Sequence, residues 1–217
     1  MIIGLTGPAG CGKDTVADLL VTHHGYHKTS FADSLYREVS EAFGIPVEAL
    51  SRRVTKELPM TGLEPVFCGD LGFIEVLQRV DPDFDWHKAY SPRQILQWWG
   101  TDYRRAQDGE YWVRQVRERI IGGMSMDRVM RQEKSPAGCK PWVVTDVRFQ
   151  NEAYPIHEFS GNLVLVERDT EAVAKHQSEA FWATCTPDFR LDNRQGLDHL
   201  RENVLSMLGS FRKGECR

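Results

Sequence analysis

A glycine-rich segment near the start of the chain carries the clearest chemistry in the sequence. Residues 7–14 read Gly-Pro-Ala-Gly-Cys-Gly-Lys-Asp and match the pattern G-x-x-x-x-G-K. Glycines allow successive backbone N–H groups to point at phosphate oxygens, and Lys13 would place its charge between the β- and γ-phosphates of a nucleotide. A predicted strand precedes the segment and a predicted helix follows it. We therefore favour a phosphate-binding loop over a turn that merely reverses the chain.

One position of this loop departs from the usual pattern. Asp14 follows the lysine where Ser or Thr normally binds Mg²⁺, and Thr15 comes next. A carboxylate is also a suitable oxygen ligand for Mg²⁺, while Thr15 can contact a phosphate. The alternative is that Asp14 is an acid favoured by the positive end of the helix dipole. The predicted ATP-binding residues of the loop are Gly7, Gly10, Cys11, Gly12, Lys13, Asp14 and Thr15.

A second acidic residue follows an apolar run in the C-terminal half. Trp142–Thr145 is typical of a buried strand, and Asp146 stands at its end. This placement fits a Walker-B-type acid near the glycine loop, with a plain helix cap as the alternative. We predict that Asp14 and Asp146 bind Mg²⁺, and that Arg148 points into the same crevice.

Arginines also cluster around a predicted helix in the middle of the chain. Ser91-Pro92 is a strong helix start, and Arg93, Arg104 and Arg105 lie on this helix or just after it. Planar guanidinium groups bind phosphate through two hydrogen bonds, so such a cluster suits a negatively charged acceptor. A solvated charged face is the alternative. The neighbouring aromatic residues, Trp98, Trp99 and Tyr103, could stack on a base or simply form core.

The elements that must position these residues alternate between strands and helices. Predicted strands cover 2–6, 26–31, 142–146, 162–167 and 189–191, and predicted helices cover 13–23, 33–43, 91–100, 111–121, 151–159 and 197–208. This alternation predicts an α/β fold, a doubly wound parallel sheet of about five strands with the ligand crevice at the strands' carboxyl ends. Gly122-Gly123 is read as the end of the fourth helix. Residues 44–90 fit no period and are read as an insertion over the site.

Composition excludes several classes of protein. The 217 residues have a formal net charge of -4, which argues against a nucleic-acid binder held by bulk electrostatics. The five cysteines are scattered without a CxxC pair, so neither a disulfide framework nor a zinc site is indicated. No apolar run approaches a membrane span, and the first residues lack a basic leader. We expect a cytoplasmic protein without membrane or nucleic-acid partners.

Taken in order, these segments resemble a known family. The stretches GPAGCGKDT, SFADSLY, SPRQILQWWGTDYRR and DVRFQNE are similar to those of the bacteriophage-type deoxynucleoside monophosphate kinases, relatives of the adenylate and dephospho-CoA kinases. The resemblance covers nearly the whole chain. Arg104 departs from it, because the family usually has a glycine there.

The resemblance implies an organisation and a set of contacts. It implies a single domain over 1–217, with an acceptor-binding insertion at about 44–140 and a lid over ATP at about 168–180, ending in His176-Gln-Ser-Glu179. Arg168 and Asn193 would contact ATP, Asn193 lying beside the adenine. Arg105 and Arg148 would act with Lys13 and Asp146 in catalysis. The acceptor-binding residues would be Asp33, Arg93, Trp98, Arg105, Arg148 and Glu152.

The function expected from these features is phosphoryl transfer from ATP, with Mg²⁺, to a deoxynucleoside monophosphate (dNMP). If the chain is viral, the expected site of action is the host cytoplasm, and a homodimer is a further expectation. Two alternatives stay open. A dephospho-CoA kinase would share the loop, sheet and lid, whereas a non-catalytic nucleotide-binding module would not need several arginines directed at a second phosphate.

Overall fold

The computed structural model describes residues 1–52, 54–131, 140–169 and 181–213, with no side-chain description for 125–131. The chain forms two compact units. Unit 1 combines Met1–Phe31 with Val116–Arg217, and unit 2 is Ala32–Gln115. Among the described residues, no helix is long and apolar enough to cross a membrane.

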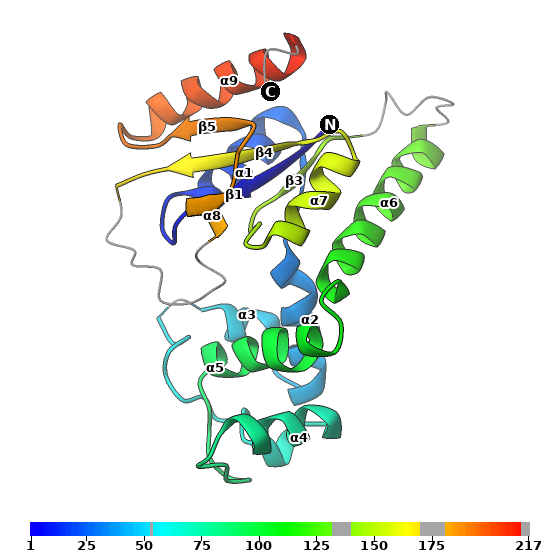
Figure 1. The fold of residues 1–217 in the computed structure, drawn as a ribbon, viewed down its shortest axis with the longest axis vertical. Coiled ribbons are helices and arrows are strands. Elements are labelled where there is room, and N and C mark those ends of the chain that lie inside the picture. The colour runs from blue at the N-terminus through cyan, green and yellow to red at the C-terminus, as the bar shows by residue number, and fades with distance from the viewer. Residues whose placement is uncertain (53, 132–139, 170–180, 214–217) are drawn as a thin grey trace. The chain divides into compact units, whose positions relative to one another are not determined.

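A five-stranded parallel sheet forms the centre of unit 1 (Figure 1). Its strands are β1 (Ile2–Thr6), β2 (His27–Thr29), β3 (Trp142–Val144), β4 (Asn162–Glu167) and β5 (Phe189–Asp192), in the order β2-β3-β1-β4-β5. All paired strands are parallel, as the sequence predicted. Because β1 lies between β3 and β4, the residues that follow β1 stand at the point where the sheet's connections diverge, which is where ligands bind in such folds.

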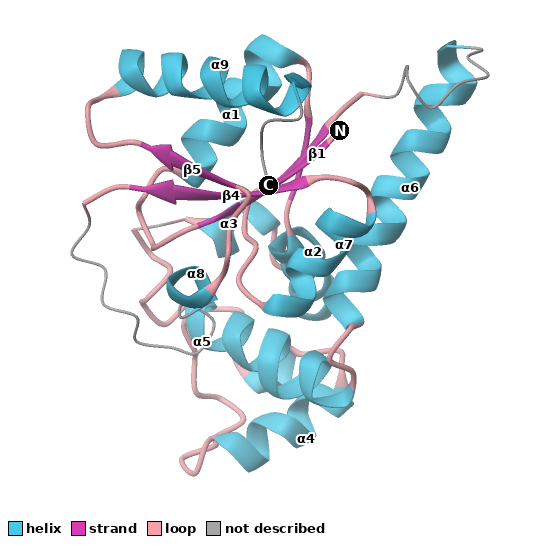
Figure 2. Ribbon diagram, turned by 45° about the horizontal axis from the view of Figure 1, so that its top comes forward, coloured by secondary structure: helices cyan, strands magenta, loops and turns pink. Residues whose placement is uncertain are grey.

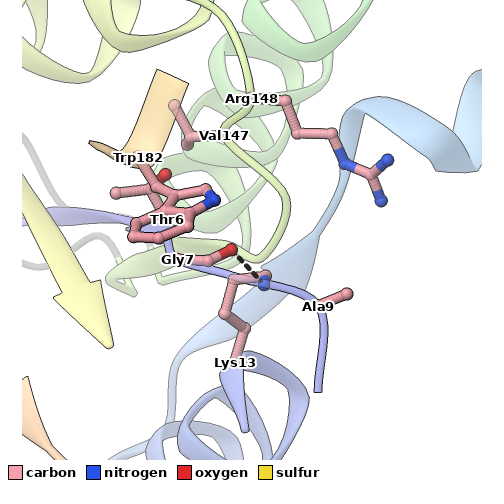
Figure 3. Close-up of a pocket in the computed structure, with 7 residues that line it drawn as sticks. All are labelled: Thr6, Gly7, Ala9, Lys13, Val147, Arg148 and Trp182. Carbon is pink, nitrogen blue, oxygen red and sulfur yellow. Dashed lines mark hydrogen bonds between the residues drawn. The ribbon is translucent and has the colours of Figure 1, made fainter. Parts of the chain in front are cut away.

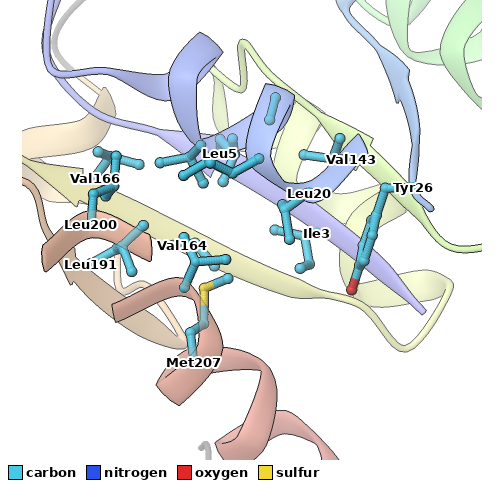
Figure 4. Close-up of a cluster of buried hydrophobic side chains, with 14 of the residues drawn as sticks. Ile3, Leu5, Leu20, Tyr26, Val143, Val164, Val166, Leu191, Leu200 and Met207 are labelled. Atoms are coloured by element: carbon cyan, nitrogen blue, oxygen red, sulfur yellow. The ribbon is translucent and has the colours of Figure 1, made fainter. Parts of the chain in front are cut away.

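A hydrophobic core lies between one face of the sheet and two helices, α1 (Lys13–His24) and α9 (Leu197–Lys213) (Figures 2 and 4). Ile3 and Leu5 of β1 are fully buried in it, together with Leu20 and Met207 from the two helices. Full burial of a Leu or Ile side chain is worth about 1.5–3 kcal/mol. This core therefore fixes the start of α1, and with it the glycine loop, against the carboxyl end of β1.

The opposite face of the sheet packs closely against α7 (Gln150–Glu158). A Cβ atom on Gly4 would lie 2.9 Å from Cγ1 of Ile156 and 3.1 Å from Cγ2 of Val147. Only a residue without a side chain fits between this strand and this helix at their present separation.

The helix α6 (Tyr111–Arg131) corrects the prediction that a helix ends at Gly122-Gly123. It runs through both glycines as far as Arg131. A Cβ atom on Gly123 would lie 2.3 Å from Cζ2 of Trp142, so this glycine allows the helix to pack on the tryptophan ring. Gly123 therefore permits close packing and does not end the helix.

Unit 2 is helical. It contains most of α2 (Phe31–Phe43), then α3 (Val47–Ser51), the short 3₁₀ helix η1 (Pro65–Phe67), α4 (Leu71–Val80), α5 (Pro92–Gln97), the π-helix η2 (Trp98–Arg105) and the start of α6. The prediction that 44–90 lacks regular structure was wrong for α3 and α4. Asp70 caps α4 by accepting a hydrogen bond from the backbone of Phe73, and Phe73, Ile74 and Leu77 form its buried face.

Ser91 is the N-cap of α5, as the sequence predicted, and it also forms a capping box with Gln94. The helix does not stop at Gly100, however, but continues as η2 to Arg105. Trp99 lies in the aromatic core of unit 2, with its ring centroid 4.6 Å from that of Phe73. A last short helix, α8 (Phe181–Thr184), precedes β5 in unit 1.

Candidate active site

The glycine loop connects β1 to α1 and has the backbone that its sequence requires. Gly7, Gly10 and Gly12 have φ values of 142°, 78° and 101°, a region that L-residues rarely adopt. A Cβ atom on Gly7 would also lie 2.6 Å from the carbonyl oxygen of Val166. Cys11, predicted to contact ATP, has its side chain in the hydrophobic core, so only its backbone can face a ligand.

Lys13 folds back over the first residues of this loop. Its Nζ atom donates hydrogen bonds to the carbonyl oxygens of Gly7 (2.7 Å) and Pro8 (2.8 Å) (Figure 3). The ammonium group is thus held at the loop by the loop's own backbone. The predicted contact of Lys13 with the β- and γ-phosphates stays a prediction.

A pocket with a volume of about 50 Å³ opens beside the lysine. It lies within unit 1, and Figure 3 shows its lining residues: Thr6, Gly7, Ala9, Lys13, Val147, Arg148 and Trp182. Lys13 and Arg148, both predicted to act in catalysis, therefore share one pocket. Trp182 was missed by the sequence reasoning, because a lone tryptophan on a four-residue helix has no periodic or motif signal.

The residues after β3 hold Arg148 at this pocket. Glu152 is buried, and its Oε2 atom accepts hydrogen bonds from the backbone N–H groups of Arg148 (2.7 Å) and Phe149 (3.2 Å). The carboxylate predicted to contact an acceptor thus fixes the turn that carries Arg148. Any direct contact of Glu152 with an acceptor stays a prediction.

The two predicted Mg²⁺ ligands both have protein partners. Oδ1 of Asp146 accepts a hydrogen bond from the backbone N–H of Phe31 (2.8 Å), the first residue of α2. Oδ1 of Asp14 lies 3.6 Å from Nζ of Lys28. Within the described residues, no group of three or more His, Cys, Asp or Glu side chains could hold a metal ion. Thr15, also predicted at the phosphates, is exposed on the first turn of α1.

Asn193 and Arg168 stand at the ends of neighbouring strands. Asn193 follows β5, is 8% exposed, and donates a hydrogen bond from Nδ2 to the carbonyl oxygen of Cys11 (2.8 Å). It therefore contacts the glycine loop itself. Arg168 is exposed just after β4. Most of the predicted lid, including His176, lies outside the described residues.

The other predicted acceptor residues belong to unit 2. Arg93 forms an ion pair with Glu57 (2.7 Å), and the ring of Trp98 packs edge-on against Tyr90 at 5.2 Å. Asp33 is exposed in the first turn of α2, and Arg105 is half-buried at the end of η2. Their contact with an acceptor stays a prediction.

Arg104, the remaining arginine of the cluster, belongs to a polar network around Glu38. Glu38 accepts hydrogen bonds from Nε1 of Trp99 (2.8 Å), Nε of Arg104 (2.8 Å) and the hydroxyl of Tyr111 (2.5 Å). The Arg104 guanidinium also lies over the ring of Tyr103, 4.4 Å from its centroid. Burial, followed by the bond to Glu38, raises the pKa of Tyr111 to about 12. Arg104, the departure from the family pattern, is therefore a structural residue of unit 2.

Comparison with known proteins shows similarity to a viral protein. A protein of Acanthamoeba polyphaga mimivirus, described as "Putative deoxynucleotide monophosphate kinase", is 30% identical over 177 residues, which cover 77% of this chain and 74% of the viral protein. No family model matches the chain.

Two solved structures are similar over nearly their whole length. TT1252 from Thermus thermophilus has a TM-score of 0.46 and 17% identity, covering 97% of this chain and 96% of that one. A dephospho-CoA kinase from Campylobacter jejuni has a TM-score of 0.46 and 13% identity, covering 99% and 98%.

Proposed function

Because the chain belongs to the deoxynucleotide monophosphate kinase family, we propose that it transfers the γ-phosphoryl group of ATP to a dNMP, giving ADP and the deoxynucleoside diphosphate. The observation that carries this proposal is the shared pocket of Lys13 and Arg148 at the carboxyl end of the sheet. One cation at the glycine loop suits the donor phosphates. A second cation in the same pocket, on a separate element, suits the group that receives the phosphoryl group.

The chemistry needs little beyond position and charge. An acceptor phosphate oxygen is already ionised near neutral pH, so no general base has to remove a proton from it. Catalysis then depends on alignment of the two phosphates and on neutralisation of the charge that spreads over the transferred group. Lys13 would neutralise charge on the donor side. Arg148, held by the buried Glu152, would align the acceptor without reorganising during the reaction.

Magnesium is proposed as the companion of ATP. Mg²⁺ commonly uses one or two protein carboxylates together with substrate phosphates and water, so Asp14 and Asp146 form a suitable donor set although no larger cluster exists among the described residues. When bound, the ion would supply positive charge that offsets the negative charge of the nucleotide's phosphates.

The acceptor is tested by offering a panel of compounds to the purified protein with ATP and Mg²⁺. The panel contains the four dNMPs, the corresponding ribonucleotides and dephospho-CoA, and products are identified by mass. We expect dNDP formation with at least one dNMP. Transfer only to dephospho-CoA would refute the proposed acceptor, and no transfer to any compound would favour the binding-module alternative.

Lys13→Ala tests the donor side. We expect loss of transfer in protein that remains folded, because the Lys13 side chain is only half-buried and its ammonium group contacts two loop carbonyl oxygens and the Cys11 sulfur. Full activity in folded Lys13→Ala protein would contradict the assignment of the loop. Cytoplasmic action and a homodimer stay predictions from the sequence.

A further inference from the structure

Asn193 connects the end of β5 to the glycine loop through a buried hydrogen bond. Its side chain donates to the Cys11 carbonyl oxygen at 2.8 Å, while its own backbone N–H donates to the carbonyl oxygen of Glu167 at 2.8 Å. The backbone bond anchors Asn193 to β4, so the amide is presented from a fixed point of the sheet. The approach to the loop is close, because a Cβ atom on Gly12 would lie 2.3 Å from Nδ2 of Asn193.

This bond fixes the direction of one peptide group of the loop. The described chain contains no cis peptide bond, and in a trans peptide the C=O and N–H bonds point in opposite directions. The Cys11 carbonyl points toward Asn193, so the N–H of Gly12 in the same peptide group points away from Asn193. Gly12 is also the N-cap of α1, where N–H groups and the helix dipole favour an anion.

We propose that Asn193 is a positioning residue for phosphate binding, which acts by orienting the Cys11–Gly12 peptide so that the Gly12 N–H donates to a phosphate oxygen of the nucleotide. The proposal rests on the proposed function only in that the loop binds the phosphates of ATP. It differs from the expectation that Asn193 lies beside the adenine. Binding of the base would not require Asn193, whereas binding of the phosphates would.

The physical requirement is a hydrogen-bond donor at this position. Leaving a buried carbonyl without a partner is costly, and the peptide can regain one only by turning. A turned peptide would present the Cys11 carbonyl oxygen, in place of the Gly12 N–H, to an anionic ligand. The loop would then repel at this point the group that it should bind.

Asn193→Asp provides a test with a pH signature. The two side chains have the same shape, but a carboxylate cannot donate to the Cys11 carbonyl, whereas a protonated carboxyl group can. We expect ATP to bind Asn193→Asp about tenfold to a hundredfold more weakly than wild type at pH 8, and the ratio to narrow as the pH is lowered to 5. The ATP affinity of both proteins is measured by calorimetry at each pH. Because both proteins bind ATP in the same protonation state at a given pH, protonation of ATP does not change the ratio of the two affinities.

Asn203→Asp is the matched control. Asn203 on α9 also donates an amide hydrogen bond to a backbone carbonyl, that of Asp192, at 2.9 Å, but does not contact the loop. We expect its affinity ratio for ATP to stay near one at every pH, even if its melting temperature falls. A purely structural role of Asn193 would give the two variants the same behaviour, and that result would overturn the proposal.

A second measurement separates this proposal from the proposed function and from loss of folding. In the wild-type protein, the amide proton signal of Gly12 should move downfield on addition of ADP, as expected for a new hydrogen bond to phosphate. In Asn193→Ser, a conservative variant with a shorter donor, this shift should be reduced in protein that remains folded by its other amide signals. An unchanged shift would overturn the role of Asn193, whereas a wild-type protein that binds neither ADP nor ATP would overturn the proposed function.

Discussion

The close contact between Gly12 and Asn193 predicts a specific energetic coupling between the two positions. In Gly12→Ala, the new Cβ atom would stand 2.3 Å from Nδ2 of Asn193, at a φ of 101°. The substitution therefore has two costs. The backbone strain of a positive φ is about 1–2 kcal/mol, and displacement of the buried Asn193 amide from the Cys11 carbonyl costs about 1–3 kcal/mol.

These costs give different sums in different backgrounds. Gly12→Ala alone should lower the free energy of unfolding by about 2–5 kcal/mol, which is the sum of both costs. Asn193→Ala alone should lower it by about 1–3 kcal/mol, because it removes the same hydrogen bond. In the double variant the amide is already absent, so Gly12→Ala adds only the strain. The total should then be about 2–5 kcal/mol, where additive effects would give about 3–8 kcal/mol.

The assay is reversible urea unfolding of the wild type, the two single variants and the double variant. A coupling of about 1–3 kcal/mol between the two substitutions is expected, with the double variant more stable than additivity predicts. Gly10→Ala is the control, because its φ of 78° brings strain while no atom lies within 4 Å of the new Cβ. Combined with Asn193→Ala, it should be additive. Additivity of Gly12→Ala as well would show that the amide does not restrain the loop.

Three further predictions concern other parts of the chain. Arg148→Ala should weaken dNMP binding about tenfold to a hundredfold and leave ATP affinity unchanged. The control Arg117→Ala removes an arginine that pairs with Glu158 at the surface of unit 1, and it should change neither affinity. Equal dNMP affinities of the two variants, measured by calorimetry, would exclude the acceptor role of Arg148. Gly123→Ala should lower the melting temperature, because overpacking against Trp142 costs about 1–3 kcal/mol and exceeds the gain in helix propensity. At the exposed Gly122, the same substitution should raise the melting temperature. If both variants are stabilised, α6 does not pack closely on Trp142. The pKa of Tyr111 is about 12 in the folded protein against 10 when unfolded, so the contribution of this pKa difference to stability is complete below pH 10 and lost as the pH rises toward 12. In Tyr111→Phe, the free energy of unfolding should therefore fall less steeply between pH 10 and pH 12 than in the wild type. An equally steep fall in both proteins would refute the raised pKa of Tyr111.

The sequence predicted the sheet well because buried parallel strands leave a local record. Runs such as Leu163–Val166 are apolar without interruption, and the glycine loop has a motif tied to a strand and a helix. Lys13 was identified by that motif and Arg148 by its position after a strand end, and the two residues line one pocket, while their roles in binding stay predictions. Such predictions need only the rule that parallel strands end at one edge.

What the sequence did not reveal depends on contacts between distant residues. Gly123 is typical of a helix end until Trp142, nearly twenty residues later, is known to pack on it. Glu152 and Asn193 are polar residues for which the family resemblance implies contacts with substrates. The hydrogen-bond partners of both side chains are backbone groups, which a pattern of side chains in the sequence does not reveal. Arg104 looked like its neighbours in an arginine cluster, yet Glu38 and the surrounding aromatic rings bind it within unit 2.

The discontinuity of unit 1 has a consequence for the order in which the protein folds during synthesis. The central strand β1 is made first, but its partners β3 and β4 begin at Trp142 and Asn162. At about 5–20 residues per second, β1 waits roughly 7–30 s for its first neighbour to emerge. Unit 2 is a continuous stretch of local helical contacts, so it can form during that interval. The apolar β1 segment is therefore the part of the nascent chain most in need of protection from aggregation, and translation rate should affect the yield of folded protein more than its final stability.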